Sequence, residues 1–111
     1  MSTITDSARG EQCQIRIPGV CSGNPETVVW CHANGSAAGK GIGMKSHDLL
    51  GAYGCANCHD EFDRRNTKAF RAGHSRKDVE LWFWQGHARS ILLLIEKGVV
   101  AVVRGKVQVL A

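Results

Sequence analysis

The cysteines constrain the fold of this chain more than any other feature. Five cysteines occur in 111 residues, and four of them form two pairs, Cys13 with Cys21 and Cys55 with Cys58. The two residues between Cys55 and Cys58 let both sulfurs reach one ion, and the upstream pair supplies the other thiolates of a closed structural zinc site. Buried free thiols are the alternative for the upstream pair. The pattern predicts a zinc-clamped finger.

The N-terminal residues and the short apolar runs of the chain favour a location inside the cell. Residues 1–10 lack the apolar core of a secretion signal, and the longest purely aliphatic run, residues 91–95, is too short to cross a bilayer. We therefore expect a cytoplasmic protein that makes no membrane contact. Thiols remain reduced in the cytosol, so the cysteines indicate a metal rather than a disulfide framework.

The length, composition and charge of the chain indicate what class of protein it is. With 43% apolar and 22% charged residues, the chain has the composition of a globular protein, and we expect a single domain over residues 1–111. Its formal net charge of +4 favours a nucleic-acid partner. Four thiolates and one Zn²⁺ would together leave +2, so the positive charge must act locally.

Hydrophobic patterning predicts the elements of the N-terminal half. Residues 13–17 alternate with the period of a half-buried strand. Residues 27–33 are rich in β-branched and aromatic side chains, which favours a second strand. A short strand over 49–54 then delivers the chain to Cys55. A helix is expected over 57–70, where acidic and basic side chains are spaced four residues apart.

The C-terminal part is predicted to be one long helix followed by a hairpin. Ser75 and Asp78 have the spacing of a helix cap, and Gly98 is a stop signal. Apolar residues extend around more than one face of this helix. Either the domain wraps it or a second subunit does, in a homodimer through the 78–97 helix. Residues 99–103 and 107–110 should form the hairpin.

The first turns of the predicted 57–70 helix combine residues that bind metals. A helix that starts near Asn57 places His59 and Asp63 four residues apart on one face. The two side chains can then hold a second ion that keeps open positions. The alternative is that His59 replaces Cys13 or Cys21 as a structural ligand.

The order of these features resembles a known family of enzymes. The predicted order is a strand that ends in His32, a long loop, a short strand and a helix that opens with the Cys55–Cys58 pair. This order resembles that of the HNH endonuclease superfamily, in its four-cysteine version. Four motifs resemble even more closely those of the small prophage-encoded proteins typified by YbcO. Nuclease activity is assigned to these proteins from fold and motif. The motifs are Ala8-Arg9-Gly10, Cys13-Gln14-Ile15-Arg16-Ile17-Pro18-Gly19-Val20-Cys21, Gly23-Asn24-Pro25-Glu26-Thr27 and Cys58-His59-Asp60-Glu61.

The resemblance extends to about residue 65 and implies the fold. It implies an α+β protein whose ββα-metal core, with its structural zinc, occupies about residues 11–71. The helix and hairpin of residues 75–111 follow this core.

The resemblance also implies roles for individual residues. His32 matches the general base, because an imidazole near neutral pH can take a proton from water. His59 matches a ligand of a catalytic divalent ion such as Mg²⁺, Mn²⁺ or Zn²⁺, and Asp63 falls at a further ligand position. Cys31 stands where many relatives have an Asp or His ligand. Asp48 falls near the central Asn, which steadies the loop and the base.

These roles predict a metal-dependent endonuclease that hydrolyses phosphodiester bonds in DNA, with a prophage role in recombination or DNA processing. Lys45, Arg64 and Arg65 are then expected to contact the nucleic acid, with a solvated helix edge as the alternative for the arginines. Because Cys31 and Asp48 depart from the family pattern, a noncatalytic zinc-stabilised DNA-binding or recombination accessory module is a second hypothesis. His32 would then be an ordinary strand-end histidine.

A third hypothesis is a protein-interaction module. It would be assembled through the aromatic run Trp82, Phe83 and Trp84 on the long helix.

Overall fold

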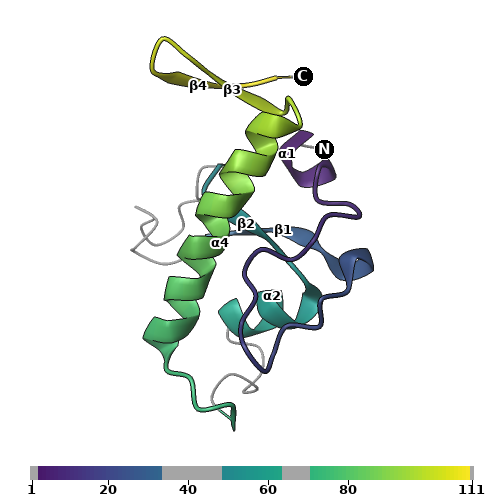
Figure 1. Ribbon diagram of the computed structural model, residues 1–111, viewed down its shortest axis with the longest axis vertical. Helices are drawn as coiled ribbons and strands as arrows, with labels where there is room; N and C mark the ends of the chain where they lie inside the picture. The colour runs from purple at the N-terminus through teal and green to yellow at the C-terminus, as the bar shows by residue number, and fades with distance from the viewer. Residues whose placement is uncertain (1–2, 34–48, 64–70, 111) are drawn as a thin grey trace.

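The structure, a computed structural model, describes residues 3–33, 49–63 and 71–110 of the chain (Figure 1). It is a mixed α+β protein, as the patterning predicted. The elements in chain order are α1 (Thr3–Asp6), the 3-10 turn η1 (Pro25–Thr27), β1 (Val29–His32), β2 (Gly51–Gly54), α2 (Ala56–Phe62), α4 (Arg76–Glu96), β3 (Val100–Val103) and β4 (Lys106–Val109).

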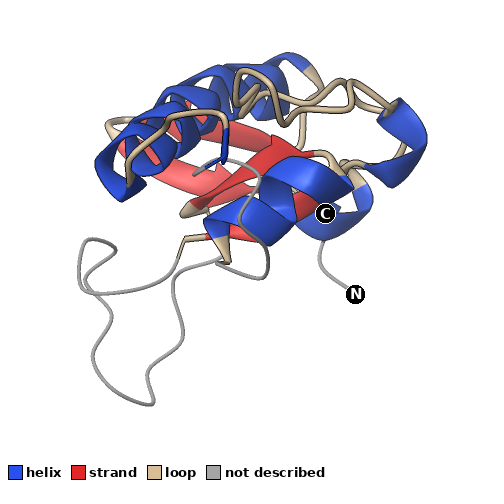
Figure 2. Cartoon of the chain, turned by 90° about the horizontal axis from the view of Figure 1, so that it is seen from below, coloured by secondary structure: helices blue, strands red, loops and turns tan. Residues whose placement is uncertain are grey.

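Strands β1 and β2 form a two-stranded antiparallel sheet at the centre of the molecule. Trp30 pairs with Tyr53, and their rings meet edge to face with centroids 5.2 Å apart. The Trp30 indole lies over Gly51, where an added Cβ would approach its Nε1 to 2.5 Å. Only glycine fits there, because real Cβ atoms do not come so close to another heavy atom. The sheet lies between α4 and α2 (Figure 2).

The long helix α4 begins and ends as its sequence predicted. The Ser75 hydroxyl accepts from the Asp78 amide and the Asp78 carboxylate accepts from the Ser75 amide, which is a complete capping box. Gly98, just past the end, has a φ of 73°, which suits glycine. Across the middle of the helix, the buried Ser90 hydroxyl accepts from the Tyr53 amide of β2.

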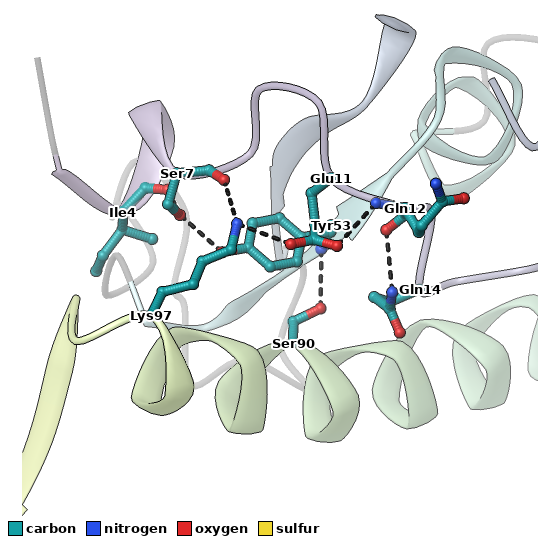
Figure 3. A network of polar contacts seen from close by, with 8 residues as sticks. All are labelled: Ile4, Ser7, Glu11, Gln12, Gln14, Tyr53, Ser90 and Lys97. Carbon is teal, nitrogen blue, oxygen red and sulfur yellow. Dashed lines mark hydrogen bonds and ion pairs between the residues drawn. The ribbon is translucent and has the colours of Figure 1, made fainter. Parts of the chain in front are cut away.

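The N-terminal segment is fixed by polar contacts to β2 and the end of α4 (Figure 3). The Lys97 Nζ lies 2.7 Å from a Glu11 carboxylate oxygen, donates to the Ser7 carbonyl at 2.8 Å, and sits 5.0 Å above the centre of the Tyr53 ring. The hydroxyls of Ser7 and Tyr53 are hydrogen-bonded at 2.7 Å. These bonds hold residues 3–11 against the core that carries the cysteines.

The C-terminal hairpin pairs β3 with β4, from Val100 opposite Val109 to Val103 opposite Lys106. Its two turn residues, Arg104 and Gly105, have φ values of 52° and 75°, the conformation that a two-residue hairpin turn requires. The hairpin extends beyond the end of α4 (Figure 1). In the described part of the chain, no helix combines the length and the apolarity that a membrane crossing needs.

The predicted strand over residues 13–17 is wrong. Ile15 and Ile17 are fully buried, but Gln14 is buried as well and the backbone turns instead of extending. The Gln14 amide donates to the Tyr53 carbonyl of β2 at 2.8 Å. Arg16 has a φ of 56°, and its N–H is directed at the Cys13 sulfur instead of at a neighbouring strand.

The other expected elements are present, with shorter limits. The strands cover Val29–His32 and Gly51–Gly54, and α2 begins one residue before the expected start and ends at Phe62. The remainder of the predicted 57–70 helix falls largely on residues 64–70, outside the described part. The long helix and the hairpin are confirmed.

Candidate metal centre and active site

The structure gathers the four cysteine sulfurs that the sequence pairs. The Sγ atoms of Cys13, Cys21, Cys55 and Cys58 all lie within 4.8 Å of one another. The first two come from the loop that follows α1, Cys55 is the N-cap residue of α2, and Cys58 lies in its first turn. Four sulfurs at this separation can hold one metal ion in a closed site. The predicted grouping is therefore confirmed.

Hydrogen bonds in the cluster stabilise two of the thiolates. The Cys58 thiol donates to Cys13, and the Arg16 N–H adds to this, which lowers the pKa of Cys13 to about 4. Burial raises the pKa of Cys55, but hydrogen bonds from Cys58 and Ser22 outweigh it, so the pKa is below its usual value.

The other two cysteines favour the protonated form. Burial raises the pKa of Cys21 to about 11. Donation to Cys13, together with burial, raises the pKa of Cys58 far above its usual range. Even so, backbone N–H groups of Gly23 and Ile17 are directed at these two sulfurs and oppose the rise. A divalent cation supplies the charge that lets all four sulfurs be thiolates, so this donor set fits a metal ion.

His59 and Asp63 form a pair at the end of α2, directly after the cysteine centre. The His59 Nε2 lies 3.1 Å from a carboxylate oxygen of Asp63, and the side chains are 30% and 20% exposed. Asp63 is the C-cap residue, and its amide donates to the His59 and Glu61 carbonyls. The spacing of four residues predicted that the two side chains share a face. An imidazole nitrogen and a carboxylate oxygen, both reachable from solvent, are a suitable pair of ligands for a divalent ion.

His59 is not part of the cysteine centre. The metal-binding group found among the described residues contains four cysteines and no histidine. The His59 ring is instead engaged with Asp63. The alternative in which His59 replaces a cysteine as a structural ligand is therefore not supported.

The two residues at the end of β1 differ in environment. Cys31 is fully buried, and its thiol faces the carbonyls of Val29 and Gly54 at 3.8 and 4.0 Å. Burial raises the pKa of Cys31, and the negative charges of Cys13 and Asp63 raise it further. His32, the next residue and the last of β1, is exposed.

The candidate catalytic residues are only partly brought together. His59 and Asp63 are in contact, and the negative charge of Asp63 contributes to the raised pKa of Cys31. The three side chains nevertheless do not form a compact ligand group among the described residues. Several other predicted site residues lie outside the described part of the chain, and these are Lys45, Asp48, Arg64 and Arg65.

Sequence reasoning did not predict the contact that Arg76 makes with α2. Its guanidinium donates to the carbonyls of Glu61 and Phe62, at the end of the helix that carries His59 and Asp63. A signal was present in the sequence: Arg76 occupies the first turn of α4, where the helix dipole disfavours a cation.

The aromatic run of α4 is engaged within the chain itself. Phe83 is fully buried and stacks on Phe62 with ring centroids 3.9 Å apart. Trp82 contacts the His74 ring, and Trp84 contacts Phe83. Phe83 therefore belongs to the core, whereas Trp82 and Trp84 pack against it and are partly exposed. The protein-interaction hypothesis stays a prediction.

Comparison with known proteins decides the family. A family model described as "Putative nuclease YbcO" matches residues 2–99 of the chain. The chain belongs to the YbcO family. Proteins named "Putative nuclease YbcO", from Escherichia coli strain K12 and from Enterobacteria phage 82, are each 42% identical to it over 100 residues, which span 90% of this chain and 98% of the relative.

A solved structure supports the same relationship. It is described as "Structure of a putative bacteriophage protein from Escherichia coli str. K-12 substr. MG1655", and it superimposes with a TM-score of 0.67 at 36% sequence identity. The match covers 84% of this chain and 96% of the other. The names of these relatives agree with the predicted nuclease function and phage association of this YbcO-family chain.

Proposed function

We propose that this YbcO-family protein is an HNH-type, metal-dependent endonuclease that hydrolyses phosphodiester bonds in DNA, in phage-related recombination or DNA processing. One observation carries the proposal: α2, which supplies Cys55 and Cys58 to the four-cysteine cluster, also carries the partly exposed His59–Asp63 pair at its end. The chain order of β1, β2 and α2 supports the proposed ββα-metal arrangement. The proposal assigns the two centres separate tasks, one structural and one reactive.

Zinc is the ion proposed for the cysteine centre. Four thiolates in a compact group suit a tetrahedral Zn²⁺ ion and leave no position open for water or substrate. This site therefore holds the loop of residues 13–21 against the start of α2 and takes no part in the reaction.

His59 and Asp63 are proposed to hold a catalytic divalent ion such as Mg²⁺, Mn²⁺ or Zn²⁺, with the nearby Cys31 as a further donor. A bound ion supplies positive charge to the scissile phosphate and the leaving oxygen. His32, exposed at the end of β1, is proposed to take the proton from the attacking water. Asp48 would orient that base.

Binding of the DNA is proposed to be mainly electrostatic. Lys45, Arg64 and Arg65 would neutralise backbone phosphates, which positions the strand without reading its sequence. We therefore expect weak sequence preference.

Plasmid nicking tests the proposal. Wild-type protein incubated with supercoiled plasmid and Mg²⁺ or Mn²⁺ should nick it, and His32→Ala should lower the rate by about 10²-fold or more, the usual contribution of a general base. The matched control is His74→Ala, because His74 bonds the Pro18 carbonyl and is assigned no catalytic role. Both variants should keep their zinc and their circular dichroism spectrum. Equal nicking by His32→Ala and wild type would contradict the assigned base.

One observation favours a noncatalytic alternative. Cys31 is fully buried and burial raises its pKa, although it occupies a position where a metal ligand is expected. A DNA-binding or recombination accessory module would show DNA affinity that falls with salt, and no cleavage with any divalent ion. Gel-shift and nicking assays on the same preparation distinguish the two functions.

A further inference from the structure

Arg76 joins the end of α2 to the start of α4. Its Nη1 donates to the Glu61 carbonyl at 3.0 Å and its Nη2 donates to the Phe62 carbonyl at 2.6 Å. The guanidinium also lies over the Phe62 ring, 5.3 Å from its centre. The Nε is 3.6 Å from a carboxylate oxygen of Glu80, one turn further along α4. Arg76 therefore binds the last turn of another helix with both terminal nitrogens.

This contact addresses a weakness of α2. The helix has only seven residues, and a helix so short is not stable on its own in water. The last carbonyls of a helix accept no intrahelical hydrogen bond of the i to i+4 kind beyond its end, and a cation is favourable at that end of the helix dipole. Arg76 supplies both hydrogen-bond donors and a positive charge to the carbonyls of the two residues just before Asp63.

The same contact fixes the geometry of the His59–Asp63 pair. Asp63 caps α2 through its amide, which donates to the His59 and Glu61 carbonyls, and its carboxylate meets the His59 ring at 3.1 Å. If the last turn frays, Asp63 leaves the position in which it shares a face with His59. Arg76 holds that turn from α4, through the carbonyls of the two residues that precede Asp63.

The position of Arg76 in its own helix supports this interpretation. Arg76 is the first residue of α4, where the helix dipole disfavours a cation. Its ion pair with Glu80 on α4 has the less favourable order, with the cation first, so the position of Arg76 is poorly explained by α4 alone. Arg76 serves the neighbouring helix whose carbonyls it binds.

We propose that Arg76 is a positioning residue that keeps His59 and Asp63 in the geometry for binding a divalent ion. The inference rests on the proposed function in one respect, that this pair is a metal site. It extends that function by naming the residue outside α2 on which the affinity of the site depends.

Mn²⁺ binding to the zinc-loaded protein tests the inference without requiring cleavage. Arg76→Gln should weaken Mn²⁺ binding, followed by electron paramagnetic resonance, by about 10- to 100-fold, the range found when a group that supports a metal ligand is removed. Arg76→Lys should recover part of the affinity, because an ammonium keeps the charge but not the forked geometry. Glu80→Gln is the matched control, since it removes the ion pair and leaves both carbonyl contacts of Arg76; its affinity should equal that of the wild type. Zinc content should match the wild type in all three variants. Arg76→Gln should stay folded at the assay temperature, with a lowered melting temperature because it loses its charged hydrogen bonds to two carbonyls.

Each result has a definite meaning. Arg76→Gln with wild-type Mn²⁺ affinity would overturn the inference, and so would loss of zinc or of the fold in that variant, which would make Arg76 a general structural residue. Wild-type protein that binds Mn²⁺ but leaves DNA intact would overturn the proposed function alone. Wild-type protein that binds no Mn²⁺ beside its zinc would overturn both.

Discussion

The two sheets of this protein have the same local geometry and very different surroundings. Each is an antiparallel pair of four-residue strands. Every residue of β2 is buried, because α4 covers it and the N-terminal segment and cysteine centre pack around it. Every residue of β4 is exposed, and β3 is buried only at its first residue. A two-stranded ladder contributes little stability by itself, so these surroundings decide which sheet is rigid.

The difference separates the part that carries the candidate sites from the part that does not. The cysteine cluster and the His59–Asp63 pair lie at α2, beside the β1–β2 sheet, whereas the β3–β4 hairpin extends beyond the end of α4 (Figure 1). We expect the two parts to open separately in amide hydrogen exchange, with the hairpin exchanging first because its backbone is less covered. The following predictions test this contrast, from the largest expected effect to the smallest.

Loss of the proposed zinc should have the largest effect. Cys58→Ser removes one sulfur of the cluster, and structural zinc contributes on the order of 10 kcal/mol in small zinc-dependent folds, so the β1–β2 part should lose its fixed packing. Near-ultraviolet circular dichroism of Trp30 and Tyr53, together with zinc analysis, measures the loss. Cys31→Ser is the control, because Cys31 is outside the cluster and this variant should keep one zinc. A Cys58→Ser protein with intact packing would show that the metal is dispensable.

Gly86→Ala should have the next largest effect. A Cβ at Gly86 would approach the Gln14 carbonyl oxygen to 2.7 Å, and that oxygen belongs to backbone that also binds Arg89. Forcing the helix and the loop apart should cost about 1–3 kcal/mol, measured by urea denaturation. Gln85→Ala, an exposed neighbour on the same helix, should change stability by less than about 0.5 kcal/mol. Similar denaturation midpoints for the two variants would mean that the contact between the loop and α4 accommodates the added methyl group at little cost in stability.

Protonation of Glu11 in acid should lower the free energy of unfolding, by less than the Gly86→Ala substitution does. The hydrogen bond from Lys97 lowers the pKa of Glu11 below its usual value of 4.5. The folded state therefore binds a proton less readily than the unfolded state. The stabilisation is present above pH 4.5 and is lost as the pH falls through the lower, folded pKa. Glu11→Gln should remove about 0.2–1 kcal/mol at neutral pH and flatten the acid limb of a plot of unfolding free energy against pH. An unchanged acid limb would place the titration elsewhere.

A polar substitution in the hairpin should have the smallest effect. Val107 on β4 is exposed, so Val107→Thr should change the free energy of unfolding by less than about 0.5 kcal/mol. Val28→Thr, at a buried position beside β1, should cost clearly more. A large loss in Val107→Thr, with dissociation in sedimentation, would instead show that a second copy covers the hairpin. That result would support a homodimer, which for the 78–97 helix remains a prediction.

The features that the sequence predicted well depend on local spacing. The four cysteines converge because two short spacings bring each pair together, and α4 begins at Ser75 and ends before Gly98 because both signals act within one turn. The hairpin followed from two valine-rich runs around a turn. His59 and Asp63 meet because four residues make about one helical turn.

The features that the sequence missed depend on contacts between distant segments. Residues 13–17 alternate like a strand, but the Arg16 amide bonds a cysteine sulfur and the chain turns. Burial of Cys31 depends on the register that places it over Gly54, which no local pattern reveals. Arg76 acts on carbonyls 14 and 15 residues away, so its contribution appears only when two helices are placed together.

The capped helix α4 also constrains how the chain can evolve. Arg76 binds α2 at one end of the helix, and Lys97 binds the N-terminal segment just past the other. Each residue adds about 1.5 Å of length and 100° of rotation, so an insertion or deletion between them would turn one of the two contacts away from its partner. Homologues should therefore keep the spacing between these two cations constant, while the length of the hairpin after Gly98 is free to vary.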